Sequence, residues 1–173
     1  MSDLYSECLV KKESTPRDAA VKYGMIALIV LCAAAGLFLF PVFLIGAVAL
    51  GVAAYFIIPG TDLEYEYLFV NGELDIDKIM AKSKRKKAKT VDLSEADIIA
   101  PLNSHRLDYY NGNSQLKVYD YSSGNPDHKR FAAIIREEGQ TCKLIFEPDE
   151  TMANAIKKSS PGKVFLLSFR ELQ

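Results

Sequence analysis

The hydrophobic positions of this chain follow two different patterns, which divide it into two parts. Residues 23–61 carry no charged side chain and are almost entirely apolar, whereas the chain from Leu63 onward alternates between apolar and polar positions. A long apolar run indicates helices that span a membrane, and a period of two indicates β-strands with one buried face. The sequence therefore predicts a membrane anchor joined to a β-rich domain.

The apolar run is too long for a single membrane helix. One helix over its length would measure on the order of 50 Å, whereas the hydrocarbon core of a bilayer is about 30 Å thick. Pro41 lies near the middle of the run, where it favours a break in the helix. We therefore predict a two-helix transmembrane hairpin over residues 16–59, with helices at about 16–40 and 42–58.

Short sequence signals support these two helices. Thr15 followed by Pro16 and Asp18 is typical of a capped helix start. Small residues spaced four apart permit close contact between helices in lipid. Two such pairs offer a packing seam: Cys32 with Gly36, and Ala47 with Gly51.

The flanks of the hairpin indicate which side of the membrane the domain occupies. A basic run follows the second helix, the connecting turn carries no base, and four bases precede the first helix: Lys11, Lys12, Arg17 and Lys22. By the positive-inside tendency, both termini face the cytoplasm and the chain is a multi-pass protein of the cell membrane. A cleaved signal peptide is the alternative, but its apolar region of roughly 7–15 residues is shorter than this run.

Residues 1–15 are predicted to be an N-terminal cytoplasmic segment. Leu4, Cys8 and Leu9 fall near one face of a helix, which indicates a short interfacial helix. A frayed terminus is the alternative.

Residues 62–173 are predicted to form the cytoplasmic β domain. LEYEYLFV and ELDIDKI both alternate, and Asn71-Gly72 between them is a strong signal for a two-residue type I′ hairpin turn. The resulting register places five apolar side chains on a core face: Tyr65, Tyr67, Phe69, Leu74 and Ile76. The opposite face is acidic and carries Glu64, Glu66, Glu73, Asp75 and Asp77.

Charges are segregated at the start of this domain. Residues 62–77 carry six carboxylates and no base, whereas residues 78–89 carry seven bases and no acid. Opposed acids such as Glu66 and Asp77 repel each other, so their face needs solvent, nearby bases or a bound cation. We expect a solvated face with ion pairs between strands. A calcium site is the weaker alternative, because no EF-hand spacing is present.

The basic run also indicates a contact surface. Bases on the cytoplasmic side of a membrane segment are attracted to anionic lipid headgroups. An ordinary solvated loop is nevertheless the favoured interpretation of this run. Contact with anionic lipid is the first alternative, and contact with nucleic acid or a protein partner is the next. The candidate contact residues are Lys82, Lys84, Arg85, Lys86, Lys87 and Lys89.

The rest of the chain is predicted to complete a small antiparallel structure. KTVDLSEADIIAPL is interpreted as one strand ending at Pro101, and the aromatic stretch HRLDYYNGNSQ as a loop. LKVYDYSS, RFAAIIREE and TCKLIFE are three further strands, the last two joined by a tight turn, with Cys142, Leu144 and Phe146 directed to the core.

A helix at about 148–160 is predicted to cap this structure. Pro148 suits its first position, and its apolar stripe consists of Met152, Ala155 and Ile156. The tail PGKVFLLSFREL adds an edge strand or packs down. The predicted fold class is a membrane α-helical hairpin plus an α+β domain, in which a small antiparallel β-barrel or sandwich is capped by the C-terminal helix.

Several stretches carry a family resemblance. LFVNGELDIDKI, KSKRK and AIIREEGQTCKLIFEPDETMANAIKK resemble a domain-of-unknown-function family of small, clostridia-type bacterial membrane proteins with two helices. The resemblance covers nearly the whole chain and implies a cytoplasmic pleckstrin-homology-like (PH-like) domain. Such domains often bind phosphoinositides through bases after the first strand. That turn is Asn71-Gly72 between acids here, so the resemblance does not imply such a headgroup pocket.

Motifs and composition argue against catalysis, cofactors and nucleic acid. His105 and His128 fall in predicted loops without a nucleophile or metal-ligand spacing, and no glycine-rich phosphate loop follows a strand. A net charge of −1 does not match the broad basic surface of nucleic-acid-binding proteins. The three cysteines form neither a disulfide framework nor a metal motif. We expect a protein that is not an enzyme and holds no metal or cofactor.

These observations together predict a membrane-anchored cytoplasmic binding or scaffolding module. It would bind a protein partner or anionic lipid at the inner membrane face. The anchor would confine the domain there and so raise its local concentration. The alternative is a non-catalytic structural subunit of a membrane complex, assembled through self-association of the hairpin.

Overall fold

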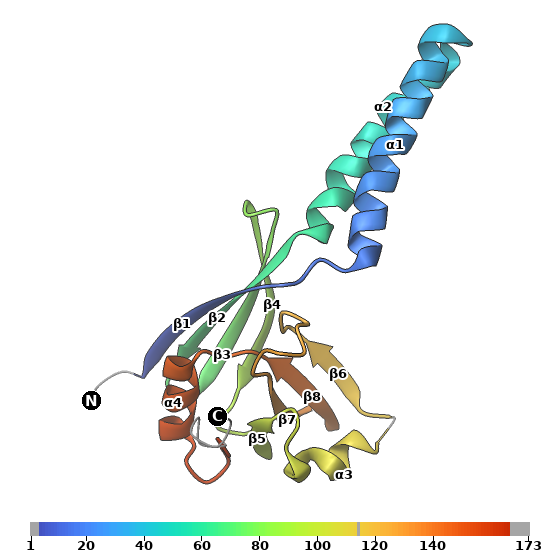
Figure 1. Cartoon of the computed structure of the whole chain (residues 1–173). Helices are drawn as coiled ribbons and strands as arrows, with labels where there is room; N and C mark the ends of the chain where they lie inside the picture. The colour runs from blue at the N-terminus through green and yellow to red at the C-terminus, as the bar shows by residue number, and fades with distance from the viewer. Residues whose placement is uncertain (1–3, 114, 167–173) are drawn as a thin grey trace. The chain divides into compact units, whose positions relative to one another are not determined.

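The computed structural model describes residues 4–113 and 115–166, and it contains two compact units. The helical unit consists of Lys12–Glu64 together with Ile79–Arg85. The β domain contains the first strand and most of the chain after Glu64 (Figure 1). The two units are described separately below.

The helical unit contains the predicted hairpin. Helix α1 spans Pro16–Phe38, α2 spans Val42–Ile57, and a 3-10 turn, η1, continues to Thr61. Helix α1, and α2 together with η1, are long and apolar enough to cross a membrane. The predicted cap is confirmed, because the Thr15 hydroxyl accepts from the Asp18 N–H and the Asp18 carboxylate accepts from the Thr15 N–H.

Close packing between α1 and α2 occurs at one of the two pairs of small residues that the predicted seam contains. Gly36 is buried, and a Cβ added there would lie 2.7 Å from the side chain of Leu44. Gly51, in contrast, has no atom within 4 Å of such a Cβ. A small residue is therefore needed at Gly36, near the turn between the helices, and not at Gly51.

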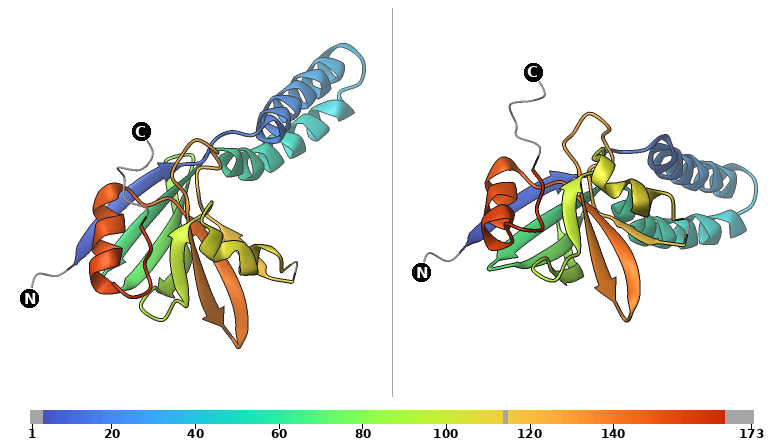
Figure 2. Two further views of the ribbon diagram at one scale, coloured as in Figure 1. Left: turned by 60° about the horizontal axis from the view of Figure 1, so that its bottom comes forward. Right: turned by 90° about the horizontal axis from the view of Figure 1, so that it is seen from below.

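The β domain is a sandwich of two four-stranded sheets (Figures 1 and 2). The first sheet has the order β1-β2-β3-β4, with β1 at Tyr5–Lys11, β2 at Leu63–Val70, β3 at Glu73–Met80 and β4 at Lys84–Asp92. The second has the order β5-β7-β8-β6, with β5 at Ile98–Pro101, β6 at Lys117–Asp120, β7 at Phe131–Glu137 and β8 at Gln140–Phe146. The sheets do not close into a barrel, so of the two predicted forms the sandwich is confirmed.

Strand β1 lies in the segment for which an interfacial helix was considered. Its inward positions are the small or apolar residues Ser6, Cys8 and Val10, which alternate as a strand requires. The backbone N–H of Lys12 donates to the Leu63 carbonyl at 2.9 Å, and the N–H of Asn71 donates to the Leu4 carbonyl at 3.0 Å. β1 and β2 are therefore antiparallel neighbours, and the helical hairpin is inserted in the connection between them.

The β2–β3 hairpin has the predicted turn and faces. Asn71 and Gly72 have φ angles of 48° and 109°, as a type I′ turn requires. All five predicted core residues of this hairpin are buried: Tyr65, Tyr67, Phe69, Leu74 and Ile76. The Tyr67 hydroxyl satisfies its buried polar group by donating to the carbonyl of Tyr121 at 2.6 Å.

Three predictions about the later strands were wrong. Most of the basic run is not a loop but the start of β4, and the segment read as one strand is split between β4 and β5 in different sheets. Asp92 ends β4 by accepting from the N–H of Ser94, a local turn without glycine or proline. The structure is also not purely antiparallel, because β6 pairs with β8 in parallel.

Helix α4, at Glu150–Ser159, covers the core beside β1 (Figure 2). It begins two residues later than predicted, because the Asp149 side chain accepts from the Met152 N–H and acts as the N-cap. The predicted stripe of Met152, Ala155 and Ile156 is buried in the main core with residues from both sheets. The predicted edge strand of the tail is limited to a bridge of Val164 to Ile99, and residues 167–173 lie outside the described residues.

The second sheet is buried on both faces, which explains the continuous apolar run in β7. Its outer face is covered by η2, at His105–Leu107, by α3, at Asp108–Asn111, and by Phe165. Lys143 of β8 points into this layer and donates to the Asn111 side chain at 2.7 Å. Burial lowers the pKa of the Lys143 ammonium group.

Candidate functional site: a basic tip and a polar cleft

The turn between β3 and β4 belongs to the helical unit and is called the basic tip here (Ile79–Arg85). The N–H of Ala81 donates to the Asp62 carbonyl at 2.9 Å, which attaches the tip to the segment that follows α2. The Lys84 ammonium lies 4.6 Å from the ring centroid of Tyr55 and 5.8 Å from that of Phe56. The tip is thus held beside the C-terminal end of α2.

This position suits a basic group chemically. The C-terminal end of a helix carries a partial negative charge, which favours Lys84 there. Tyr55 is an amphipathic ring of the kind found at membrane–water interfaces, and a cation over its face gains attraction from the ring quadrupole. The exposed bases of the tip, Lys82, Lys84 and Arg85, therefore lie at the end of a helix that is apolar enough to cross a membrane.

Two of the other predicted contact residues extend along β4. Lys86 is exposed on the strand, and Lys87 forms an ion pair with Asp75 of β3 at 2.9 Å. The hydroxyl of Thr90 also donates to Asp75. The Thr90 hydrogen bond and then Lys87 lower the pKa of the Asp75 carboxyl, and Asp75 in turn raises the pKa of Lys87. The expected ion pairing between the acidic face and the basic run occurs here.

The acidic face itself lies opposite the core, as its alternation predicted. Glu73 is exposed, whereas the other four acids are half-buried: Glu64, Glu66, Asp75 and Asp77. The charges of Asp75, Asp77 and Glu73 all raise the pKa of Lys87. These three acids therefore act as a shared counter-charge for Lys87.

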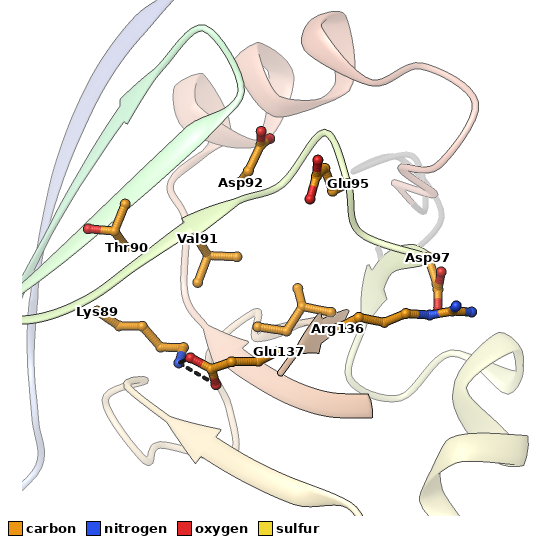
Figure 3. A pocket seen from close by; sticks show the side chains of 9 residues that line it. Lys89, Thr90, Val91, Asp92, Glu95, Asp97, Arg136 and Glu137 are labelled. Carbon is orange, nitrogen blue, oxygen red and sulfur yellow. Dashed lines mark hydrogen bonds and ion pairs between the residues drawn. The ribbon is translucent and has the colours of Figure 1, made fainter. Parts of the chain in front are cut away.

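Lys89, the last of the predicted contact residues, is turned into the β domain and pairs there with a carboxylate. Its side chain is mostly buried, and its ammonium donates to both carboxylate oxygens of Glu137 on β7, at 2.7 and 2.8 Å (Figure 3). It also lies 3.9 Å from the ring centroid of Tyr119, whose hydroxyl donates to Glu137 at 2.9 Å. These two donors, Lys89 first and then Tyr119, lower the pKa of the Glu137 carboxyl. Burial by itself would lower the pKa of the Lys89 ammonium, but the hydrogen bond and the charge of Glu137 raise it.

The Lys89–Glu137 pair lies at a cleft of about 470 Å³ between β4 and β7 (Figure 3). Val91 and Ile135 form an apolar floor and are 7% and 6% exposed. The rim is polar and carries Lys89, Thr90, Asp92, Glu95, Asp97, Arg136 and Glu137. Sequence reasoning missed this cleft, because its two walls are some forty residues apart in the chain and meet only through the sheet order.

Comparison with known proteins identifies the family. Neither the curated proteins nor the solved structures gave a match. A family profile described as "Bacterial PH-like domain (DUF6106)" matches residues 2–166, which includes β1, the helical hairpin and α4. This agrees with the sandwich of two sheets and its C-terminal helix. The chain belongs to this family of bacterial PH-like domain proteins.

Proposed function

We propose that this protein is a membrane-anchored, non-catalytic binding module whose basic tip binds anionic lipid headgroups at the cytoplasmic face. The hairpin α1–α2 crosses the cell membrane twice and leaves both termini in the cytoplasm. One observation carries the proposal: Lys84 lies against Tyr55 at the end of a membrane-length helix, with Ala81 hydrogen-bonded to Asp62.

Charge and geometry support a headgroup contact at the tip rather than along the whole basic run. Lys87 and Lys89 already bind the carboxylates of Asp75 and Glu137. The tip is the part of the run that shares a unit with the membrane helices. Each base near an anionic surface gains about 1 kcal/mol, so three bases favour anionic over zwitterionic lipid by up to about 3 kcal/mol.

Energy transfer from a tryptophan beside the tip tests this proposal. The chain contains no tryptophan, so Tyr55→Trp provides a single donor whose ring can still accept Lys84. The full chain is reconstituted in phosphatidylcholine vesicles that contain a trace of pyrene-labelled phosphatidylglycerol or pyrene-labelled phosphatidylcholine. We expect transfer to the anionic probe to exceed transfer to the zwitterionic probe by about twofold to fivefold, and the excess to decline in high salt.

Matched charge variants separate the tip from general electrostatics. Changing Lys82, Lys84 and Arg85 to Gln should abolish the excess transfer. The control changes three bases elsewhere to Gln, at Lys117, Lys157 and Lys158, and should preserve it. Equal transfer to both probes in the unaltered tip, or equal effects of both triple variants, would show that the tip does not select anionic lipid.

A further inference from the structure

We propose that the cleft between β4 and β7 binds an extended, basic segment of a partner protein, which adds as a strand between the two sheets. This site is separate from the basic tip, and the proposal does not depend on lipid binding there. It rests on two uncovered strand edges, on the direction of their peptide groups, and on the chemistry of the floor and rim.

Within residues 4–113 and 115–166, no strand pairs with either wall on the side of the cleft, so both walls are strand edges. β4 is the last strand of its sheet. β7 has β5 on its outer side only from Phe131 to Ile134, so Ile135–Glu137 extend past the end of β5. Uncovered edges present unpaired N–H and C=O groups, which are a template for pairing with an extended chain.

The free peptide groups of β7 point toward the cleft. Glu138 and Gly139 form a two-residue turn with φ angles of 51° and 78°, so the flanking pair Glu137–Gln140 exchanges hydrogen bonds within the hairpin. By alternation, the N–H and C=O of Arg136 point away from β8. Two residues earlier, the Ile134 carbonyl lies on this same side of the strand and accepts from the N–H of Asp97 at 2.8 Å.

The free groups of β4 point toward the same cleft. The N–H of Leu93 donates to the Gly72 carbonyl at 2.8 Å, which places the β3 side of the strand at Leu93. Alternation then directs the N–H and C=O of Thr90 and the N–H of Asp92 away from β3. The Asp92 carbonyl is not available, because it accepts from the N–H of Glu95 at 3.3 Å. The four cleft residues of β4, 89–92, extend over about 13 Å, the length of about four residues of a bound strand.

The side chains of the cleft select the chemistry of the bound segment. A strand has side chains on alternating sides. One set would contact the apolar floor of Val91 and Ile135, which suits Val, Ile or Leu. The other set would meet a rim with four acids and two bases, where Lys89 pairs with Glu137 and Arg136 with Asp97 at 3.3 Å. The acidic excess at Asp92 and Glu95 favours Lys or Arg in the partner.

Peptide selection on the full chain tests the proposal. The protein is incorporated into lipid nanodiscs and screened against a phage-displayed library of random octapeptides, with counter-selection on empty nanodiscs. We expect enriched sequences in which apolar residues alternate with Lys or Arg. An enriched peptide is then synthesised with a fluorophore, and its affinity is measured by anisotropy at physiological salt.

Two sets of variants distinguish strand addition from attraction to an acidic surface. Methylating the backbone nitrogens of the peptide one at a time should weaken binding at least tenfold at alternate positions and less than twofold at the others. Glu95→Lys should weaken binding at least tenfold, whereas the control Asp127→Lys, an exposed acid outside the cleft, should change it less than twofold.

Three results would overturn the proposal. The first is no enrichment above empty nanodiscs. The second is binding that lacks the alternating response to methylation or is insensitive to Glu95→Lys. The third is a concentration-dependent dimer that excludes the peptide, which would assign the cleft to a second copy of this chain. None of these results depends on the energy transfer to anionic lipid at the basic tip.

Discussion

The ion pair between Lys89 and Glu137 links the edge of one sheet to the other, so its removal should loosen the β domain in a predictable way. We consider Lys89→Met, Glu137→Gln and the double variant. Met keeps the length of the lysine stem, and Gln keeps an oxygen that can accept from Tyr119. The three variants form a double-mutant cycle, which isolates the interaction between the two side chains.

The structure sets the magnitude of this interaction. The Lys89 side chain is 10% exposed and donates two short charged hydrogen bonds to Glu137. Such bonds contribute about 1.5–3 kcal/mol when they are buried. Glu137 is 41% exposed, and pairs in solvent contribute only about 0.2–1 kcal/mol. The pair lies between these limits, so we expect a coupling free energy of about 1 kcal/mol. Lys89→Met also loses the contact with the Tyr119 ring, worth about 0.5 kcal/mol.

The reactivity of Cys142 measures the effect on the folded protein. Cys142 lies on β8 opposite Ile135 and is 2% exposed, so a thiol reagent modifies it only when the domain opens. The full chain in detergent micelles, with Cys8 and Cys32 changed to Ala, is treated with excess maleimide at constant pH. A free-energy change of about 1 kcal/mol alters the modification rate about fivefold.

The cycle has one outcome that agrees with this reasoning. Each single variant should react about fivefold or more faster than the unaltered pair. The double variant should react about fivefold more slowly than the product of the two single effects. If the single effects multiply to within a factor of about 1.5, the two side chains are not coupled and the ion pair contributes no stability.

Other predictions concern the anchor, the acidic face and the inserted hairpin. Replacing residues 13–62 by Asn-Gly should give a soluble, folded β domain by circular dichroism and size exclusion, because the replaced segment lies between paired strands; aggregation would contradict this pairing. Gly36→Val should separate α1 from α2 near Leu44 and lower the yield of a disulfide engineered between the two helices, whereas Gly51→Val should not. Equal effects of the two variants would contradict the packing at Gly36. The pKa of Asp75 is lowered from 3.8, so its contribution to stability is present above that value and lost as pH falls through the folded pKa. Asp75→Asn should therefore flatten the acid limb of the unfolding curve, and an unchanged limb would contradict the assignment.

The elements that sequence reasoning predicted are those with local signals. Asn71-Gly72 fixed the register of β2 and β3 because only such residues readily adopt positive φ at both turn positions. Thr15 and Asp18 likewise located the start of α1. These features depend on neighbours within a few residues, so the alternating pattern and the turn or cap residues were sufficient to predict them.

The elements that sequence reasoning missed depend on distant partners. β1 pairs with β2 across the entire membrane segment, and its inward Ser6 and Cys8 gave too weak a hydrophobic period to suggest a strand. The parallel pairing of β6 with β8 and the cleft at Lys89 and Glu137 also arise from segments far apart in the chain. Among the candidate site residues, the pairing of Asp75 with the basic run followed from adjacent strands and was predictable.

The insertion of the helices between β1 and β2 has a consequence for biosynthesis. β1 leaves the ribosome before either helix, but the strand that it pairs with emerges only after both helices have been made. In the proposed topology, the N-terminal strand therefore stays on the cytoplasmic side without its partner while the hairpin is inserted into the membrane. Pairing of β1 with β2 would then require that the chain after α2 has come back to the side of the membrane on which β1 lies.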